Sequence, residues 1–389
     1  MLLHWIWLAT RPSVNDRLKM ALLQHFHDPE DVFYAEKGAL EQVEGMTQEA
    51  LEALQEKDTK PAQAIIKDCA GKDIRICTFH DAAYPARLKN ISDPPMVLYY
   101  KGNLPDLDSV PAIAVVGTRG ATAYGLNAAK RLGGQIAKCG GIVVSGLAAG
   151  IDGAAISGAL SAGGTVVGVL GSGADVVYPL KNRGLFADTQ RYGCLLSEFV
   201  PGTPPMKWNF PKRNRIISGM SCGVLVVEAP EKSGALITAR CAADQGRDVF
   251  VVPGNIDVPT FVGSNRLLRD GAIAVSSGWD VMSEYAAQYP DKITEFAGKP
   301  EKIQPKVAQN APLFGNSQAS KHKEDKKVID NGEASPYSGL KDKRPQLLPD
   351  EQKILSALTK EARSIDDVIA ETGIPTARML ATLTLLQVK

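Results

Sequence analysis

The sequence predicts an α/β protein whose centre is a doubly wound, mostly parallel β-sheet. The first indication is a regular alternation, from residue 110 onward, of short apolar runs with segments of helical periodicity. The second is the composition of those runs, which are rich in Val and Ile and do not alternate strictly with polar residues. This pattern is typical of strands covered on both faces, as in a parallel sheet between two layers of helices.

The individual elements follow from the same alternation. The expected strands are the apolar runs at 110–116, 141–144, 165–170, 194–197, 224–228, 248–252 and 272–275. The expected helices are the periodic segments at 124–138, 152–162, 182–191, 213–220, 235–245, 264–270 and 278–289. Because a helix separates each strand from the next, the strands are expected to run parallel in one domain at 110–289.

Two segments of different character precede this domain. Residues 1–70 predict a small helical module, because apolar residues such as Leu18, Leu22 and Phe26 recur at helical spacing. Residues 71–109 contain one strand-like run, IRICTF, followed by a stretch rich in Pro, Asp and Tyr. We therefore expect an adapter at 71–109 that packs on the edge of the sheet domain.

Two further segments follow it. Residues 290–346 are polar and charged and contain Pro, Gly and Ser, which predicts a flexible linker. Residues 347–389 give three helical stretches, which fit either a winged-helix core or a generic three-helix bundle. The sequence stops at LLQVK without the β-hairpin that forms a wing. We therefore expect a winged-helix-like module without its wing, or a truncated chain, and either DNA or a protein as its partner.

The composition indicates the redox compartment of the protein and argues against disulfides, metal sites and membrane spans. The six cysteines form no C-x-x-C pair and no Cys/His ligand spacing, so we expect a reducing compartment, no disulfide framework and no structural metal. The apolar N-terminus lacks the charged start and the cleavage pattern of a signal peptide, which favours a core helix. An apolar run of about 18 residues is absent, so no membrane span is expected.

Three loops rich in small residues follow predicted strands and open predicted helices. They are 117–125 (GTRGATAYG), 145–153 (SGLAAGIDG) and 233–238 (SGALIT). Backbone N–H groups at such loops can face an anion, and in a doubly wound sheet all three lie at the carboxyl ends of strands. Arg119 lies in the first loop and can reach the same anion. The loops therefore predict a site for an anionic ligand.

The segment 207–218 (KWNFPKRNRIIS) indicates what kind of anion this is. It contains four cations and two aromatic residues without an acid, in a chain of net charge +1. Phosphates attract the cations and unstacked bases attract the rings, so a single-stranded nucleic acid fits the segment well. The alternative is a surface loop whose aromatic residues pack on the core while its cations face water.

Other ligands and reactions have weaker support. The segment 171–176 (GSGADV) lacks the third Gly of a dinucleotide-binding fingerprint, and no P-loop motif is present. The five histidines fall outside the sheet domain. Acids near strand ends are interpreted first as helix caps or arginine partners: Asp152, Asp175, Glu198, Glu228 and Asp257. An enzyme acting on a nucleotide or phosphoribosyl compound remains the alternative, with Glu228 and Asp152 as its acids.

Ordered motifs across residues 84–273 closely resemble the DNA-processing protein A (DprA/Smf) family. They are YPARLKNISDPPMVLYYKG, VVGTRGATAYG, SGLAAGID, YPLKN, SEFVPGTPP, FPKRNRIISGMS, VVEAPEKSGALITA, GRDVFVVPG and GSNRLLRDGA. The resemblance implies a Rossmann-like domain flanked by an N-terminal module similar to sterile-α-motif or helix-hairpin-helix folds and by a winged-helix-like C-terminal module. It also implies a cytoplasmic, cofactor-free homodimer that is not an enzyme. Such a protein binds single-stranded DNA, protects incoming DNA and loads the RecA recombinase during natural transformation.

The resemblance also implies site residues at the matching positions. The candidates for DNA binding are Arg119, Ser145, Gly146, Lys181, Phe210, Lys212, Arg213, Asn214 and Arg215. Phe210 is the preferred base contact over Trp208, and Leu267 and Leu268 are expected dimer contacts. One departure is Ile156, which occupies a position where the family often has His, and it weakens the case for catalysis.

Overall fold

The computed structural model describes residues 2–296, 356, 368 and 372–375. By its contacts the chain divides into two units, Met1–Gln304 and Pro305–Lys389. The linker predicted at 290–346 lies outside the described residues from 297 onward. The C-terminal module predicted at 347–389, with its missing wing, also lies outside them except for the six positions named above.

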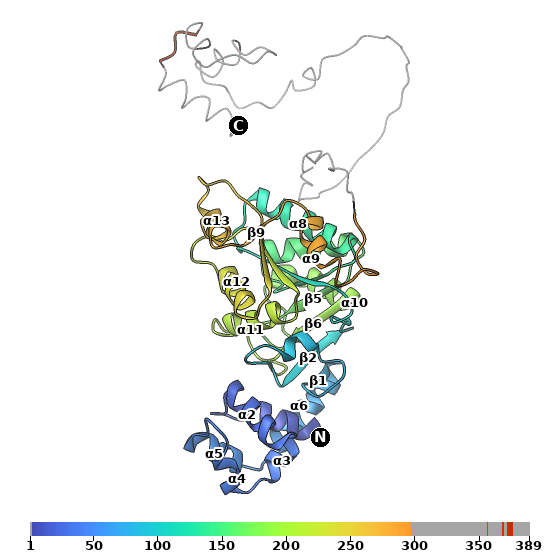
Figure 1. Ribbon diagram of the computed structural model, residues 1–389, viewed down its shortest axis with the longest axis vertical. Coiled ribbons are helices and arrows are strands. Elements are labelled where there is room, and N and C mark those ends of the chain that lie inside the picture. Colours follow the sequence, from blue (N-terminus) through green and yellow to red (C-terminus); the bar gives the residue numbers. More distant parts are fainter. Residues whose placement is uncertain (1, 297–355, 357–367, 369–371, 376–389) are drawn as a thin grey trace, which may run out of the picture. The chain divides into compact units, whose positions relative to one another are not determined.

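The described residues form a nine-stranded sheet with the order β1-β2-β6-β5-β4-β3-β7-β8-β9 (Figure 1). The strands from β6 to β9 in this order pair in parallel, whereas β2 pairs antiparallel with β6, and β1 antiparallel with β2. Strands β3 to β6 are laid down toward one edge and β7 to β9 toward the other, so the sheet is doubly wound. The strands are β1 (Arg75–Thr78), β2 (Val97–Gly102), β3 (Ala112–Val116), β4 (Ile142–Ser145), β5 (Val166–Val169), β6 (Gly193–Ser197), β7 (Gly223–Val226), β8 (Asp248–Val251) and β9 (Ile273–Ala274).

Two apolar cores cover the two faces of the sheet. Ile113 and Val115 of β3 face one core, and Ala112, Ala114 and Val116 face the other, as the period of a strand requires. The first core is closed by α8 (Ala123–Lys138), α9 (Ile151–Ser161), α10 (Arg183–Tyr192) and α14 (Gly278–Met282). The second is closed by α7 (Ala86–Lys89), α11 (Asn209–Gly219) and α12 (Gly234–Asp244), with leucines of α13 (Val262–Arg269) packed against it.

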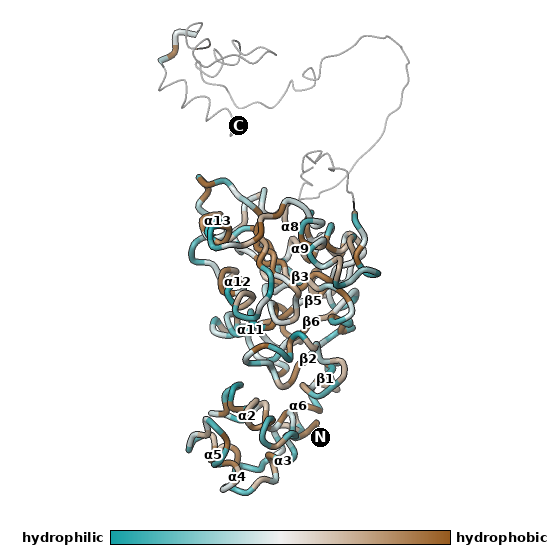
Figure 2. The backbone as a smooth tube through the Cα atoms, in the orientation of Figure 1, coloured by the Kyte–Doolittle hydropathy of each residue, from teal (hydrophilic) through white to brown (hydrophobic). Residues whose placement is uncertain are grey.

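The N-terminal helices build a third core of their own. Trp7, Leu8, Leu22 and Leu54 are fully or almost fully buried within it. Figures 1 and 2 show these helices as a separate group next to β1 and β2, with apolar positions along their paths. They are α1 (Leu2–Ala9), α2 (Asp16–Phe26), α3 (Pro29–Tyr34), α4 (Lys37–Glu41), α5 (Gln48–Gln55) and α6 (Lys60–Gly71).

The sequence prediction of the fold class is confirmed, with three local corrections. β2 was not predicted, because its Val-Leu-Tyr-Tyr run lies in a Pro- and Asp-rich context; the strand pairs with β6 and extends the sheet. Helix α11 begins at Asn209 instead of 213, because Pro211 is tolerated in a first helical turn, where its missing N–H needs no partner. The helix predicted at 278–289 ends at Met282 and continues as a short 3-10 turn, Ser283–Tyr285.

Candidate functional site

A cleft of about 660 Å³ opens at the carboxyl ends of β3 and β7, where the strand order reverses direction. Its walls are the loop after β3, the loop after β7 and the first turns of α11 and α12. Ligands of doubly wound sheets bind at this switch point, because the loops on its two sides diverge. The lining residues with polar or aromatic side chains include Arg119, Asp152, Tyr178, Lys207, Phe210, Arg213, Asn214, Lys232 and Ser233.

Glu228 holds the loop after β3 in place. Its carboxylate accepts hydrogen bonds from the N–H and the hydroxyl of Thr122, at 3.1 and 2.9 Å. Thr122 in turn caps α8, and Gly125 in its first turn must be Gly because a Cβ would lie 1.8 Å from a Glu228 oxygen. Glu228 is fully buried. Glu228 therefore has a structural role, in which it supports the capping residue Thr122.

Arg213 is a buried cation in the cleft wall. Its Nη1 donates to the carbonyl oxygens of Gly146, at 3.0 Å, and Val169. Asp152, at the start of α9, lines the same cleft and accepts a hydrogen bond from the N–H of Gly146 at 3.1 Å. Burial raises the pKa of Asp152, while the charge of Arg213 acts in the opposite direction. Burial lowers the pKa of Arg213 to about 10, so the guanidinium remains charged at neutral pH.

Phe210 presents an aromatic face beside two cations. The guanidinium carbon of Arg119 lies 5.1 Å from the centre of the Phe210 ring, and that of Arg213 lies 5.9 Å from it. The ring of Tyr178 is 5.7 Å away and tilted by 39°. A smaller cavity of about 100 Å³ shares Arg119, Tyr178 and Phe210 with the cleft and also touches Gly146. A ring face next to guanidinium groups suits a base and its phosphate.

Five of the predicted DNA-binding residues are brought together here. Arg119, Phe210, Arg213 and Asn214 line the cleft, and Gly146 lines the smaller cavity. Asn214 also donates from Nδ2 to the carbonyl of Gly234 at 3.2 Å, which ties α11 to the start of α12. Lys181 is exposed in the turn Leu180–Asn182 and lies outside the lining of both cavities.

Two lysines were missed as site residues. Lys207 precedes α11 and Lys232 precedes α12, and both side chains line the cleft. Ser233 caps α12 by accepting from the N–H of Ala235, so the N-terminus of this helix also opens at the cleft. The signal for Lys232 was available, because it stands directly before the small-residue loop at 233–238. Lys207 belonged to the basic segment but lay outside the recognised motif.

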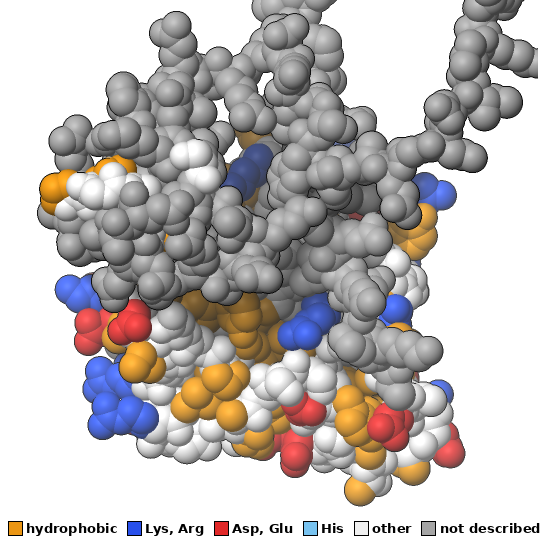
Figure 3. Space-filling view, turned by 90° about the horizontal axis from the view of Figure 1, so that it is seen from above, with side chains coloured by type: hydrophobic (Ala, Val, Ile, Leu, Met, Phe, Trp, Pro, Cys, Tyr) orange, Lys and Arg blue, Asp and Glu red, His pale blue; other side chains and the backbone are white. Residues whose placement is uncertain are grey.

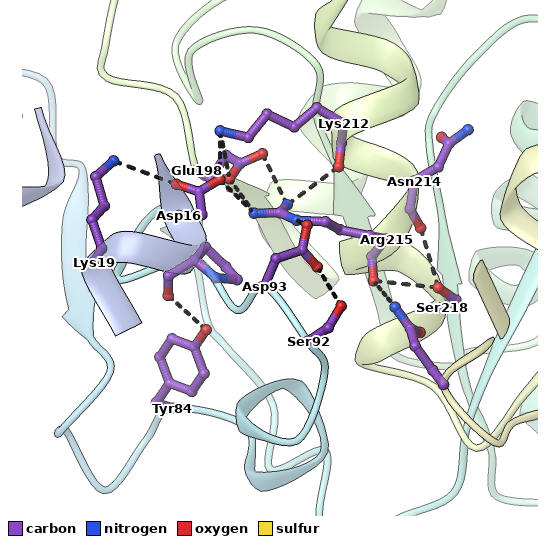
Figure 4. Close-up of polar contacts among 12 residues, drawn as sticks. Asp16, Lys19, Tyr84, Ser92, Asp93, Glu198, Lys212, Asn214, Arg215 and Ser218 are labelled. Atoms are coloured by element: carbon purple, nitrogen blue, oxygen red, sulfur yellow. Dashed lines mark hydrogen bonds and ion pairs between the residues drawn. The ribbon is translucent and has the colours of Figure 1, made fainter. Parts of the chain in front are cut away.

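Three predicted site residues are directed elsewhere. The hydroxyl of Ser145 is fully buried and donates to the carbonyl of Val115 at 2.6 Å. Arg215 donates to both oxygens of Glu198, at 3.0 and 2.8 Å, and Lys212 lies 2.9 Å from an oxygen of Asp16 (Figure 4). None of these three side chains lines the cleft among the described residues. The sequence motif alone could not distinguish Lys212 and Arg215 from Arg213, because the acids that pair with them lie far away in the chain.

The other acids near strand ends either pair with polar groups of the protein or are exposed to solvent. Asp175 contacts Lys72 at 2.7 Å and accepts from the N–H of Gly202 at 2.8 Å. Glu198 pairs with Arg215, as the interpretation of these acids as arginine partners predicts. Asp257 is exposed.

The remaining candidates are the two proposed dimer contacts, the isoleucine at the position of the family's His, and Trp208. Leu267 and Leu268 are half-buried and pack against the second core. Ile156 is fully buried in the first core, so the position where the family often has His holds an apolar packing residue here. Trp208 is 68% exposed and does not line the cleft.

The surface of the described residues carries charges of both signs. In the view of Figure 3, Lys and Arg side chains lie between hydrophobic and acidic ones instead of forming one continuous field. Within the described ranges no group of three or more His, Cys, Asp or Glu residues is arranged to hold a metal ion. No helix among the same residues is long and apolar enough to cross a bilayer.

Comparisons with known proteins agree with this geometry. A family model described as DNA recombination-mediator protein A matches residues 75–286, and one described as the DprA winged helix domain matches 340–389. Protein Smf of Synechocystis is 34% identical over 99% of this chain and 94% of its own length. The DNA processing protein DprA of Bacillus subtilis is 46% identical over 52% of this chain and 68% of its own.

Solved structures show the same relationship. The X-ray structure of DNA processing protein A from Streptococcus pneumoniae aligns with a TM-score of 0.65 at 34% identity, over 73% of this chain and 98% of that one. A structure of the Helicobacter pylori protein, which describes its single-stranded DNA binding mode, aligns with a TM-score of 0.50 at 29% identity, over 55% and 97% of the two chains. With one family model spanning more than half of its residues, and a relative matched along nearly its whole length, the chain belongs to the DNA processing protein A (DprA/Smf) family.

Proposed function

We propose that this protein binds single-stranded DNA in the cleft at the switch point, and does so without catalysing a reaction. The observation that supports this most directly is the grouping of Arg119, Lys207, Arg213 and Lys232 in one cleft, with Arg119 and Arg213 beside the partly exposed ring of Phe210. Cations hold successive phosphates, and the ring supports a base irrespective of its identity. The Helicobacter pylori relative, which binds single-stranded DNA, supports the same assignment.

The contacts divide into two kinds. Arg213 is fixed by carbonyl acceptors and faces Asp152, so it supplies a positive charge that does not need to reorganise when a phosphate arrives. Arg119, Lys207 and Lys232 are nearer to solvent and can adapt to the path of a strand. The N-terminus of α12 adds backbone N–H groups on the side of Lys232. We assign phosphate binding to these groups and base stacking to Phe210, with Gly146 allowing close approach.

The enzymatic alternative is less well supported by these contacts. Glu228 is fully buried and its carboxylate is used by Thr122. Asp152 does line the cleft, but it is engaged by the N–H of Gly146 and lies close to Arg213. Turnover of nucleoside monophosphates that disappears in Glu228→Gln or Asp152→Asn would favour the alternative over the binding role.

Within this proposal the protein protects incoming DNA and loads the RecA recombinase during natural transformation, as a cytoplasmic homodimer. A single-stranded DNA binder that covers the backbone electrostatically suits both roles. Leu267 and Leu268 on α13 remain the proposed dimer contacts, and Val262, the first residue of the same helix, is 44% exposed. Sedimentation of the wild type and of Val262→Asp measures this part separately: a dimer that the substitution converts to monomer supports it.

A titration with labelled oligonucleotides tests the binding function. Fluorescence anisotropy is measured with a single-stranded oligodeoxythymidine, a mixed-sequence single strand and the matching duplex at several salt concentrations. With three to four cations in the cleft, log K is expected to fall with log salt at a slope of about −2 to −3, since a single strand contributes about −0.7 per phosphate. Affinity should be similar for the two single strands and much weaker for the duplex. Equal affinity for single strand and duplex would contradict the proposal.

A further inference from the structure

We propose that Asp16 in the N-terminal helical module is an autoinhibitory group, which pairs with Lys212 and keeps this lysine from a phosphate of the bound strand. The inference rests on the proposed single-stranded DNA binding and adds a regulatory contact to it. Helix α11 carries Phe210 and Arg213, which line the cleft. Lys212 and Arg215 are on the same helix, but each forms an ion pair with an acid.

The contact joins two parts of the chain that are distant in sequence. Asp16 is the first residue of α2, and its Oδ2 lies 2.9 Å from Nζ of Lys212 and 3.5 Å from Nη2 of Arg215 on α11. Lys19, one turn further on α2, lies 3.4 Å from the same carboxylate. Figure 4 shows the side chains of Asp16, Lys212 and Arg215 converging between the two helices. The N-terminal module is therefore coupled electrostatically to the helix that carries the candidate site.

The ion pairs in this cluster differ in how easily a phosphate can replace the acid. Arg215 and Glu198 have side chains only 7% and 6% exposed and form two hydrogen bonds, which makes them a fixed pair. Asp93 adds a third contact to Arg215, at 2.9 Å. Lys212 has a side chain that is 44% exposed and makes one close contact, with Asp16, and a longer one of 3.7 Å, with Glu198. Lys212 is therefore the member that can leave the cluster.

Asp16 can compete with a DNA phosphate for the ammonium group of Lys212, because its carboxylate is charged. Burial raises its pKa, but Lys19, Lys212 and Arg215 outweigh this effect and the pKa of Asp16 is lowered overall. The carboxylate is thus ionised at neutral pH and competes with phosphate for the same ammonium group. The Lys212 side chain is 44% exposed, so a phosphate can reach its ammonium group and replace the carboxylate.

Lys212 is on the helix that forms one wall of the cleft. Its sequence neighbours Phe210, Pro211 and Arg213 line the cleft, whereas the Lys212 side chain is directed to Asp16 and Glu198. Surfaces for single strands engage about 4–16 nucleotides, and the four cations that line the cleft hold at most about four phosphates. A longer strand continues past the cleft, and Lys212 becomes an additional contact when Asp16 releases it.

The test is a double-mutant cycle on DNA affinity. Asp16→Asn keeps the shape of the side chain and removes its charge, and Lys212→Ala removes the lysine. Asp16→Asn is expected to bind a single-stranded oligonucleotide about fivefold more tightly at 0.1 M salt and to steepen the salt slope by about 0.7, since one further phosphate contributes about 0.7 of a decade per decade of salt. The gain should vanish when Lys212→Ala is added.

A matched control separates this effect from a general change in charge. Glu49→Gln removes one exposed negative charge from α5 of the same module, far from this cluster in sequence. It should leave the affinity and the salt slope as in the wild type. A gain equal to that of Asp16→Asn would mean that any acid of the module acts by long-range repulsion, and the pairing with Lys212 would be rejected.

The other outcomes are equally decisive. Unchanged or weaker binding by Asp16→Asn, with the wild type binding normally, means that Asp16 braces α11 and does not inhibit it. Failure of the wild type itself to bind single strands counts against the proposed function, not against this contact alone. If Asp16→Asn does not fold by circular dichroism, Asp16→Ala replaces it in the same cycle, because Asn15 is the N-cap of α2 and alanine has the highest propensity inside a helix.

Discussion

Arg213→Ala is expected to lower the free energy of unfolding, in addition to any effect on DNA binding. Arg213 is 4% exposed and Asp152 is 6% exposed, and the charge of the arginine counteracts the pKa increase that burial imposes on Asp152. Removing the guanidinium leaves a buried carboxylate without its cation and frees the carbonyls of Gly146 and Val169. Leaving a buried polar group without its partner costs about 1–3 kcal/mol, and more for a charged group. The N–H bond from Gly146 to Asp152 persists, so we expect a cost of about 3 kcal/mol.

Urea unfolding followed by circular dichroism measures this cost at pH 7. Asp152→Asn serves as the second member of a cycle, because it removes the charge that Arg213 balances. The double variant Arg213→Ala, Asp152→Asn should be more stable than the sum of the single effects predicts, by about 1–3 kcal/mol of coupling. Additive effects of the two substitutions would refute the charge balance.

The pH dependence supplies an independent check. The pKa of Asp152 in the folded protein is raised by burial above its ordinary value of about 3.9, and Arg213→Ala raises it further. The folded variant then binds the proton more tightly than the unfolded chain. Its stability relative to the wild type should therefore rise as the pH falls from the folded pKa of Asp152 in the variant to the lower, but also raised, folded pKa in the wild type. A cost that stays the same at every pH from 7 down to the onset of acid unfolding would contradict the assignment.

The other expectations concern binding and the structural acids. Arg119→Ala should keep the stability of the wild type but weaken single-strand binding about fivefold at 0.1 M salt and reduce the slope by about 0.7; an unchanged slope in the anisotropy titration removes Arg119 from the site. Phe210→Ala should cost about 1–3 kcal/mol of binding with little change in slope, whereas Phe210→Tyr keeps most of the affinity; a loss of slope instead would mean that the ring only positions cations. Glu228→Gln should lower the free energy of unfolding by about 1–3 kcal/mol, since its amide meets the N–H and hydroxyl of Thr122; a fully stable variant would rule out the capping role.

The sheet could be predicted from sequence because its physical signature is local. Strands such as β3 and β7 are buried on both faces, and continuous apolar runs mark them without knowledge of their neighbours. β2 was missed because its identity depends on pairing with β6, a partner far along the chain, and because prolines precede it. The start of α11 was missed because Pro211 resembles a helix breaker until its position in the first turn is known.

The site could be predicted in part for a similar reason. Arg119, Phe210 and Arg213 belong to loops and helix starts at the switch point, so the strand–helix alternation already indicates where they gather. Arg213 and Arg215 cannot be separated by local pattern, since they stand two residues apart in one motif. Their different roles depend on Asp16, Asp93 and Glu198, which only the folded chain brings to Arg215.

Photo-crosslinking of a bound single strand tests the central claim most directly. An oligonucleotide that carries 5-iododeoxyuridine at successive positions is irradiated on the wild-type protein, and the linked peptides are identified by mass spectrometry. The account predicts links to the ring cluster of the cleft, at Phe210 and Tyr178, that are lost in high salt together with binding. Links confined to the N-terminal helices α1 to α6 or to α13, with none in the cleft, would contradict it.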